Sequence, residues 1–270
     1  MKRKLSVLFT AALAMFLLAG CSTTNAAITA DTASGFWERA FVLPLTQFIT
    51  FLYGVLGHNL GFAIIAATVI VRLVLMPLFA YSNKSMAAMQ EVQPEIQRIQ
   101  KKYEGKKDPE SQQRMMAETS AIYKKYKVSP ASGCLPLLLQ MPIFMAFFQA
   151  INRHPMIAVL RENPDATASS AYFFGLNLAA TMSMPNYILG ALVAGLTFVS
   201  QRLMTKNQNT SNQNKQMGTT MKAMNIYFPF MMFATVIAMP AAMGLYFLVG
   251  QIMQMIQTLV FRRPAAGPTF

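Results

Sequence analysis

One permanent cation, Arg72, lies near the middle of a long apolar run that extends from Leu60 to Ser82. A guanidinium at this depth in a lipid-compatible helix costs about 3 kcal/mol on insertion scales and above about 10 kcal/mol in simulations. Arg72 lies about 15 Å of helix from the end of the run, beyond the reach of a snorkelling side chain. Thr68 lies four residues earlier, shares the helix face of Arg72 and begins a polar stripe.

Two environments would accept this arginine: a neighbouring carboxylate or a water-filled cavity. None of the other apolar runs contains Asp or Glu. The sequence therefore favours an unpaired cation that faces a watery cavity, and a buried arginine paired with a carboxylate is the weaker alternative.

Residue patterns typical of enzymes are missing. The two histidines, His58 and His154, lack Cys, Asp or Glu partners at metal-ligand spacing, so no metal site is predicted. No phosphate-binding loop or dinucleotide fingerprint occurs, so we expect no nucleotide cofactor. The chain also lacks a recognisable RNA-binding module, and recognition of a specific nucleic-acid sequence is not expected. The prediction is a protein without catalytic residues or cofactors.

Composition indicates a membrane protein with several spans. The chain has 270 residues, of which 54% are hydrophobic and only 12% charged. Its formal net charge is +13. The basic residues cluster between the apolar runs, so we interpret them first as determinants of topology.

The N-terminus predicts a secretory signal over residues 1–20 and a lipid anchor. A basic start is followed by a short apolar stretch and by Leu18-Ala19-Gly20-Cys21, which resembles a bacterial lipobox. Cleavage would expose Cys21 for diacylglyceryl attachment with fatty acids such as palmitate, followed by a flexible linker over 21–34. An ordinary cleaved signal and an uncleaved anchor are the alternatives. Cys134 would then be the remaining thiol, so no intramolecular disulfide is expected.

Residues 35–57 are predicted to form an amphipathic helix on the outer surface. If this segment crossed the membrane, the Lys-rich stretch after Ser82 would lie outside, against the positive-inside tendency. Trp37 and Phe41 are the expected interfacial anchors.

Five spans, with the N-terminus outside and the C-terminus in the cytoplasm, place every basic loop inside. The fold class is therefore an all-α integral membrane protein. Pro240 to Ala242 allows only a tight outer turn between the last two spans. The predicted spans are 58–82, 133–151, 187–204, 224–239 and 243–261. An outer loop is predicted over 152–186, a cytoplasmic loop over 205–223 and a cytoplasmic tail over 262–270.

The charged stretch 83–132 predicts a cytoplasmic helical hairpin. Apolar residues recur at three- and four-residue steps in both halves. The pattern breaks at Gly105, after which Asp108 is a suitable cap and Pro109 a suitable first helical residue. The sequence leaves two roles open for this hairpin, a solvated spacer and a docking surface.

Four pieces of the chain resemble, in the same order, the YidC-type membrane protein insertases of the YidC/Oxa superfamily. The Gly-Cys-x-Pro…Gln-Met-Pro-Ile pattern is the most specific of them. The lipobox, the absence of a large domain before the first span and the short C-terminal tail resemble the Gram-positive form. The pieces are VIVRLVLMPL (69–78), MQEVQPEIQRIQKKY (89–103), GCLPLLLQMPIFMAFF (133–148) and MPAAMGLYFLVGQI (239–252).

This resemblance implies five spans around a hydrophilic groove that is open to the cytoplasm and to lipid. Arg72 matches the groove cation, Thr68 a groove-facing polar position, and Phe247 an aromatic substrate-contact position on the last span. Gln140 and Gln201 are added as polar candidates on the second and third spans. The function implied is insertion and folding of membrane proteins in the bacterial plasma membrane. The partners implied are nascent membrane-protein substrates, membrane lipids, the ribosome and, as an open question, the Sec translocon.

Two other functions compete with this interpretation. A small transporter or channel would use Arg72 as an anion site and would show paired broken spans or an internal repeat, and no convincing repeat is visible. A structural assembly factor without a groove would keep Arg72 inaccessible to water.

Overall fold

The computed structural model describes residues 27–106, 108–129, 135–162, 172–205 and 215–261. The predicted signal peptide, the predicted lipidation site Cys21 and the tail 262–270 lie outside these residues. The described part is almost entirely helical. Its elements are α2 (Gly35–Trp37), the π-helix η1 (Glu38–Val42), α3 (Leu43–Val55), α4 (Leu60–Val74), α5 (Met76–Lys102), α6 (Pro109–Lys125), α7 (Leu135–Asn152), α8 (Pro155–Glu162), β1 (Tyr172–Phe173), β2 (Leu176–Asn177), α9 (Met184–Thr205), α10 (Lys215–Ala238) and α11 (Ala241–Phe261).

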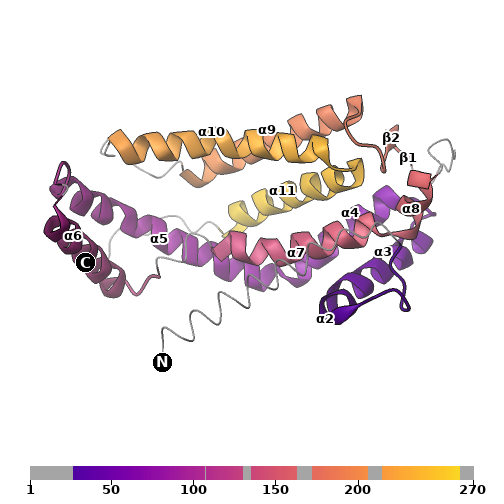
Figure 1. Ribbon diagram of the computed structural model, residues 1–270, viewed down its shortest axis with the longest axis horizontal. Coiled ribbons are helices and arrows are strands. Elements are labelled where there is room, and N and C mark those ends of the chain that lie inside the picture. The colour runs from indigo at the N-terminus through magenta and orange to yellow at the C-terminus, as the bar shows by residue number, and fades with distance from the viewer. Residues whose placement is uncertain (1–26, 107, 130–134, 163–171, 206–214, 262–270) are drawn as a thin grey trace.

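The central helix is α11, which lies between two groups of helices (Figure 1). It contacts α9 and α10 on one side and α4, α5 and α7 on the other. Its approach to α9 requires Gly244, because a Cβ atom there would lie 2.4 Å from the Leu189 side chain. Both groups of helices therefore pack on one shared element.

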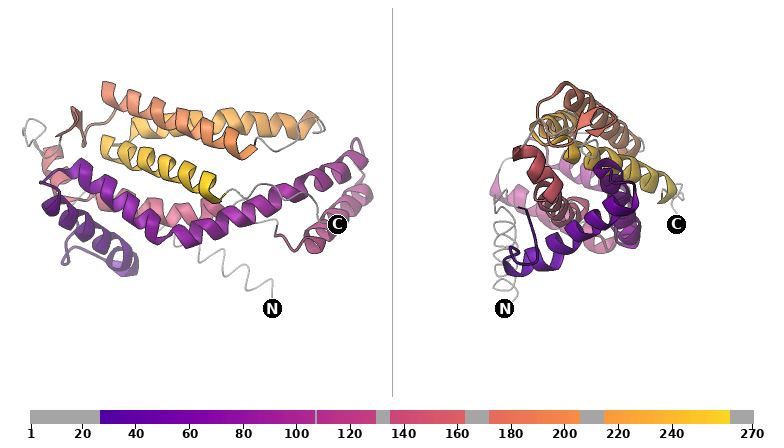
Figure 2. Two further views of the ribbon diagram at one scale, coloured as in Figure 1. Left: turned by 180° about the vertical axis from the view of Figure 1, so that it is seen from behind. Right: turned by 90° about the vertical axis from the view of Figure 1, so that its right-hand side faces the viewer.

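A short β-hairpin closes one end of the bundle. Strands β1 and β2 pair antiparallel. The backbone N–H groups of Ala241 and Ala242 donate to the carbonyls of Ala180 and Leu178, both at 3.0 Å, and the Phe173 ring lies 5.1 Å from that of Phe62. Helices α4 and α11 therefore start at the same end and run in the same direction. The hairpin of α5 and α6 extends from the opposite end (Figure 2).

The apolar run from Leu60 to Ser82, which is predicted as one span, consists of two helices. Helix α4 ends at Val74 and α5 begins at Met76, with a bend of 64° between them. Pro77 accounts for the break, because it has no N–H to donate to the carbonyl of Leu73 and its ring crowds that carbonyl. Arg72 therefore lies in the last turn of α4, just before the bend.

Two described helices, α7 and α11, are long and apolar enough to cross a membrane, and the bent pair α4 and α5 makes a third if it counts as one span. The described apolar part of α10, Ile226–Ala238, is shorter. The structure agrees with an all-α membrane protein apart from the small β-hairpin, and the number of five spans stays a prediction.

The segment 35–55 is held to α7 by buried polar contacts, which we call the η1–α7 clamp. Arg153 donates to the Glu38 carboxylate at 2.5 Å, and both residues are buried. The Trp37 indole N–H donates to Gln149 Oε1 at 3.1 Å. Burial alone raises the pKa of Glu38, but hydrogen bonds from Ser34 and Arg153 outweigh this effect and lower that pKa. Trp37 is therefore buried against protein, and the expectation that it anchors in lipid is wrong.

His154 follows the clamp and is buried beside α3. Its Nδ1 accepts from the Met156 backbone N–H at 3.3 Å, so the ring proton lies on Nε2, which is 3.1 Å from Thr50 Oγ1. Burial lowers the pKa of His154 to about 4. The neutral ring is the form that fits these contacts, because protonation of Nδ1 would remove the acceptor for Met156.

Replacing Arg153 with Met should destabilise the protein by about 3 kcal/mol, because Glu38 is then buried without its cation. The free energy of unfolding in detergent micelles at pH 7 measures this effect. Arg39→Met is the matched control, since Arg39 is exposed and its Nε–H donates to the Ala33 carbonyl and not to a carboxylate in the described ranges. Equal losses in the two variants would contradict the clamp.

Acidification should destabilise the protein through His154. Its pKa is lower in the folded state than the ordinary value near 6.5, so its contribution is complete above about pH 6.5 and is lost as the pH falls towards 4. The loss at pH 5 is about 2 kcal/mol, measured by unfolding at pH 7 and pH 5. His154→Gln keeps a donor for Thr50 and does not titrate, so its stability should fall less over this interval. A fall as large as in the unsubstituted protein would assign the pH dependence to other groups.

Candidate functional site

Arg72 is enclosed by neutral groups from three helices. Its Nη1–H donates to Gln254 Oε1 of α11 at 3.1 Å, and its Nη2–H donates to Gln140 Oε1 of α7 at 3.3 Å. Its guanidinium carbon lies 4.8 Å from the centre of the Phe79 ring on α5. The residue is 7% exposed. We call Arg72, Gln140, Gln254 and Phe79 the Arg72 cluster.

The position of Gln140 is set by a second contact. Its Nε2–H donates to the Tyr246 hydroxyl at 2.8 Å, which orients its oxygen towards Arg72. Tyr246 is buried, and its ring stacks on Phe147 with centroids 4.7 Å apart. Space for the guanidinium comes from Gly250, where a Cβ atom would lie 3.2 Å from Arg72 Nη2. The cluster therefore depends on packing between α7 and α11.

The charge of Arg72 is not neutralised by a carboxylate within the described ranges. Its hydrogen bonds there go to two amide oxygens, so two of its five N–H groups are used. The sequence prediction of an arginine without a carboxylate partner agrees with this geometry. The prediction of an unpaired side chain does not, because both glutamines hold it.

The other predicted site residues differ in whether they bind the Arg72 side chain. Thr68 is buried, and its hydroxyl donates to the Ile64 carbonyl of its own helix at 2.7 Å. Phe247 is half-buried beside Phe144, with ring centroids 5.5 Å apart. Gln201 lies on α9 and is not one of the groups that contact Arg72. Gln140 is the one predicted candidate that binds the cation directly.

Sequence reasoning missed Gln254, Tyr246, Gly250 and Phe79 as site residues. The available signal was the three-residue spacing of Gln251, Gln254 and Gln257, which places polar side chains near one face of an otherwise apolar helix. The spacing does not indicate which of the three glutamines reaches Arg72.

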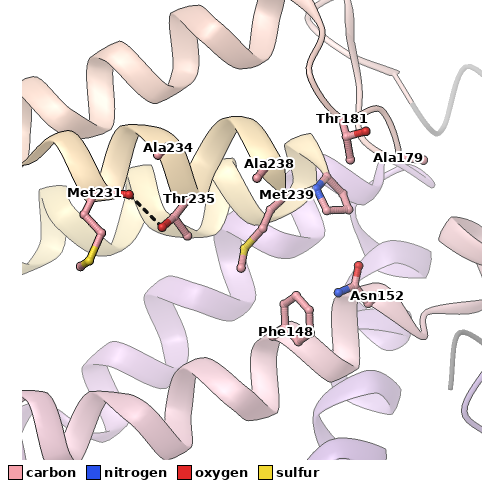
Figure 3. Close-up of a pocket in the computed structure, with 10 residues that line it drawn as sticks. Phe148, Asn152, Ala179, Thr181, Met231, Ala234, Thr235, Ala238 and Met239 are labelled. Carbon is pink, nitrogen blue, oxygen red and sulfur yellow. Dashed lines mark hydrogen bonds between the residues drawn. The ribbon is translucent and has the colours of Figure 1, made fainter. Parts of the chain in front are cut away.

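An apolar cavity of about 780 Å³ lies between α7 and α10, towards the β-hairpin end. Phe148 points into it from α7, Met231 from α10 and Met239 from the turn that follows α10 (Figure 3). Asn152 and Thr181 supply polar groups at its edge. We call it the α7–α10 cavity.

Comparison with known proteins identifies the family. The family model described as "60Kd inner membrane protein" matches residues 51–267. The membrane protein insertase YidC of Oceanobacillus iheyensis is 38% identical over 98% of this chain and 98% of its own length. The chain belongs to the YidC family of membrane protein insertases.

Two further YidC-family relatives are similar over nearly their whole length. The membrane protein insertase MisCA of Bacillus subtilis is 36% identical and covers 98% of this chain and 93% of its own length. The membrane protein insertase YidC 2 of Bacillus anthracis is 36% identical, with coverages of 98% and 95%. The names of these relatives are those of membrane protein insertases and not of enzymes, which agrees with the prediction of a protein without catalytic residues.

Arg72 and Gln254 should be energetically coupled. A double-mutant cycle with Arg72→Met and Gln254→Leu should give a coupling energy of about 1.5 to 3 kcal/mol, the range for a hydrogen bond to a charged group. The measurement is unfolding of the four proteins in detergent micelles. The matched cycle pairs Arg72→Met with Gln201→Leu and should give additive effects. Coupling in the second cycle alone would place Gln201, not Gln254, at the cation.

Proposed function

We propose that this YidC-family chain inserts membrane proteins by holding a polar or acidic substrate tail at Arg72 and releasing the apolar segment between α7 and α10. The observation that carries the proposal is the charge of Arg72, which is buried between two amides and the Phe79 ring without a carboxylate in the described ranges. The remaining guanidinium donors suit an anionic or carbonyl-rich ligand. The names of the relatives support the same activity.

In this mechanism, different interactions stabilise the acidic tail and the apolar segment of the substrate. A cation in a weakly polar environment attracts an acidic tail more strongly than one in water, which lowers the cost of desolvating that tail. Burial of the apolar segment contributes about 25 cal/mol per Å². The membrane potential adds about 2.3 kcal/mol per charge per 100 mV when an acidic tail moves outward.

The proposed membrane arrangement has five spans around a hydrophilic groove open to the cytoplasm and to lipid. The spans are those of the sequence prediction, with α4 and the start of α5 as the first. Basic residues of the α5–α6 hairpin and of the segment 205–223 support a cytoplasmic position for that end. The sequence predicted this segment as a loop, but α10 already begins at Lys215. The β-hairpin and the helices α2 and α3 then lie at the outer surface.

The remaining candidate residues receive roles from their contacts. Gln140 and Gln254 hold the guanidinium, and Phe247 with Phe144 offers an aromatic surface beside the cluster. Thr68 and Gln201 become groove residues only if the bundle opens, because Thr68 is buried here and Gln201 lies on α9.

Two further proposals follow from the sequence. Cys21 carries a lipid anchor after removal of the signal peptide, which places the N-terminus outside. The α5–α6 hairpin receives the incoming chain and, with the basic segment 205–223 and the basic C-terminal end, contacts the ribosome. Its Lys102–Glu118 ion pair at 2.6 Å joins the two helices, and Asp108 caps the start of the second.

Replacing Arg72 with Ala should reduce insertion of a substrate with an acidic tail by about tenfold, the effect of losing about 1.4 kcal/mol of charge-assisted hydrogen bonding. Arg72→Lys should retain part of the activity because it keeps the charge but not the fork of donors. Insertion into vesicles that contain the purified protein is measured by protease protection of the tail. A matched substrate with a neutral tail should lose less. Undiminished insertion of the acidic tail would remove Arg72 from the mechanism.

A further inference from the structure

Ser82 and Gln257, which lie beyond the Arg72 cluster, are among the buried polar side chains without a hydrogen-bond partner in the described part of the chain. Ser82 of α5 is 1% exposed and Gln257 of α11 is 3% exposed. The Ser82 hydroxyl and both polar atoms of the Gln257 amide lack a partner, as does Nδ2 of the neighbouring Asn83. Buried polar groups are nearly always hydrogen-bonded, so these atoms point to a polar ligand.

The contrast with other buried hydroxyls strengthens this conclusion. Thr46, Thr68 and Thr197 are also buried in helices, and each donates to the carbonyl four residues earlier at 2.7 to 2.9 Å. Ser82 makes no such bond. Its hydroxyl therefore remains available to a group from outside its own helix.

Ser82 and Gln257 lie on adjoining helices, one turn beyond the Arg72 cluster. Phe79 and Gln254 contact Arg72, and Ser82 and Gln257 follow them by three residues each. Because α4 and α11 run in the same direction and α5 packs on α11, both residues lie further towards the α5–α6 hairpin. The end of α11 lies beside the first turns of α5 in both views (Figures 1 and 2).

We infer that Ser82 and Gln257 bind the main chain of the substrate's extended polar tail, next to the Arg72 cluster. A primary amide offers a donor and an acceptor, which match the C=O and N–H of a peptide unit, and the serine hydroxyl adds one more of either kind. Both side chains are neutral, so they do not select for charge. This inference rests on the proposed function and assigns two roles within it. Arg72 selects for the charge of the tail, whereas Ser82 and Gln257 bind its main chain whatever that charge is.

The spacing suits one extended chain. Three helical residues separate Gln257 from Gln254, which corresponds to a rise of about 4.5 Å. An extended peptide covers this distance with little more than one residue. A tail whose acidic side chain reaches Arg72 therefore places a neighbouring peptide unit at Gln257.

The experiment combines changes in the protein with changes in the tail backbone. Substrates carry tails of equal length and charge, built from either Gly and Ser or from Pro, which has no N–H to donate. With the unsubstituted protein, the Gly/Ser tail should be inserted about three to ten times better, the effect of one or two hydrogen bonds. In the double variant Ser82→Ala, Gln257→Leu, the two tails should be inserted equally well, and insertion of the Gly/Ser tail should fall more than that of the Pro tail, which offers only its carbonyls to these side chains.

The control variant is Ile256→Ala, which changes a 46% exposed neighbour on the same helix and should leave both tails unaffected. A photo-crosslinking residue at position 257 should also label the tail, whereas one at position 256 should not. Unfolding in detergent should show that the double variant is at least as stable as the unsubstituted protein, because it removes polar groups without partners. Marked destabilisation would reveal partners within the protein and would overturn the inference.

Failure of this inference is distinguishable from failure of the proposed function. If the double variant inserts both tails as the unsubstituted protein does, or loses both equally, Ser82 and Gln257 do not bind the tail backbone. If Arg72→Ala still impairs the acidic tail in that case, the proposed function stands without this inference. If Arg72→Ala has no effect, the proposed function fails whatever the double variant shows.

Discussion

Burial of the Arg72 guanidinium is the constraint on which the arrangement of the central helices depends. A cation that is only 7% exposed needs acceptors, and here they are two glutamine oxygens on α7 and α11. Gln140 is held in turn by Tyr246, and Gly250 leaves room for the fork of nitrogens. The hydrogen bonds that join α4 to α7 and α11 therefore offset the free-energy cost of burying the Arg72 charge.

Two arginines are buried in the part of the chain that the structure describes, and their electrostatic settings are opposite. Arg153 faces the Glu38 carboxylate at 2.5 Å, so its charge is compensated and the pair fastens the η1–α7 clamp. Arg72 faces only amides and an aromatic ring within the described residues, so its charge acts on whatever enters the cluster. The difference separates a structural arginine from one suited to binding, because only an uncompensated cation attracts a further anion.

Local sequence signals predicted the features that depend on neighbouring residues. The apolar runs indicated the helices, and Asp108 before Pro109 indicated the cap that accepts from the Ser111 N–H. Arg72 was identified because a charge in an apolar run is costly wherever the partners lie. Pro77 was visible too, but the continuous apolar run favoured one straight helix, and the bend was missed.

Features that depend on contacts between distant residues were not predictable from one sequence. Trp37 meets Gln149 across 112 residues, so its pattern was interpreted as that of a lipid-facing anchor. Gln254 meets Arg72 across 182 residues, and neither Gln251 nor Gln257 differs from it in sequence signal. Thr68 shares the face of Arg72, yet its hydroxyl bonds within its own helix, which periodicity does not reveal.

The Arg72 cluster and the α7–α10 cavity both include residues of α7, so one substrate could contact both. Gln140 and Phe148 lie eight residues apart on α7, about 12 Å along its axis. Between them, the Phe144 ring lies 5.9 Å from that of Phe148 and 5.5 Å from that of Phe247. This aromatic row separates the Arg72 cluster from the α7–α10 cavity. In the proposed mechanism a substrate places its polar tail on one side of the row and its apolar segment on the other. Phe247 then belongs to the boundary between the two environments, which explains why an aromatic ring without a polar tip suits this position.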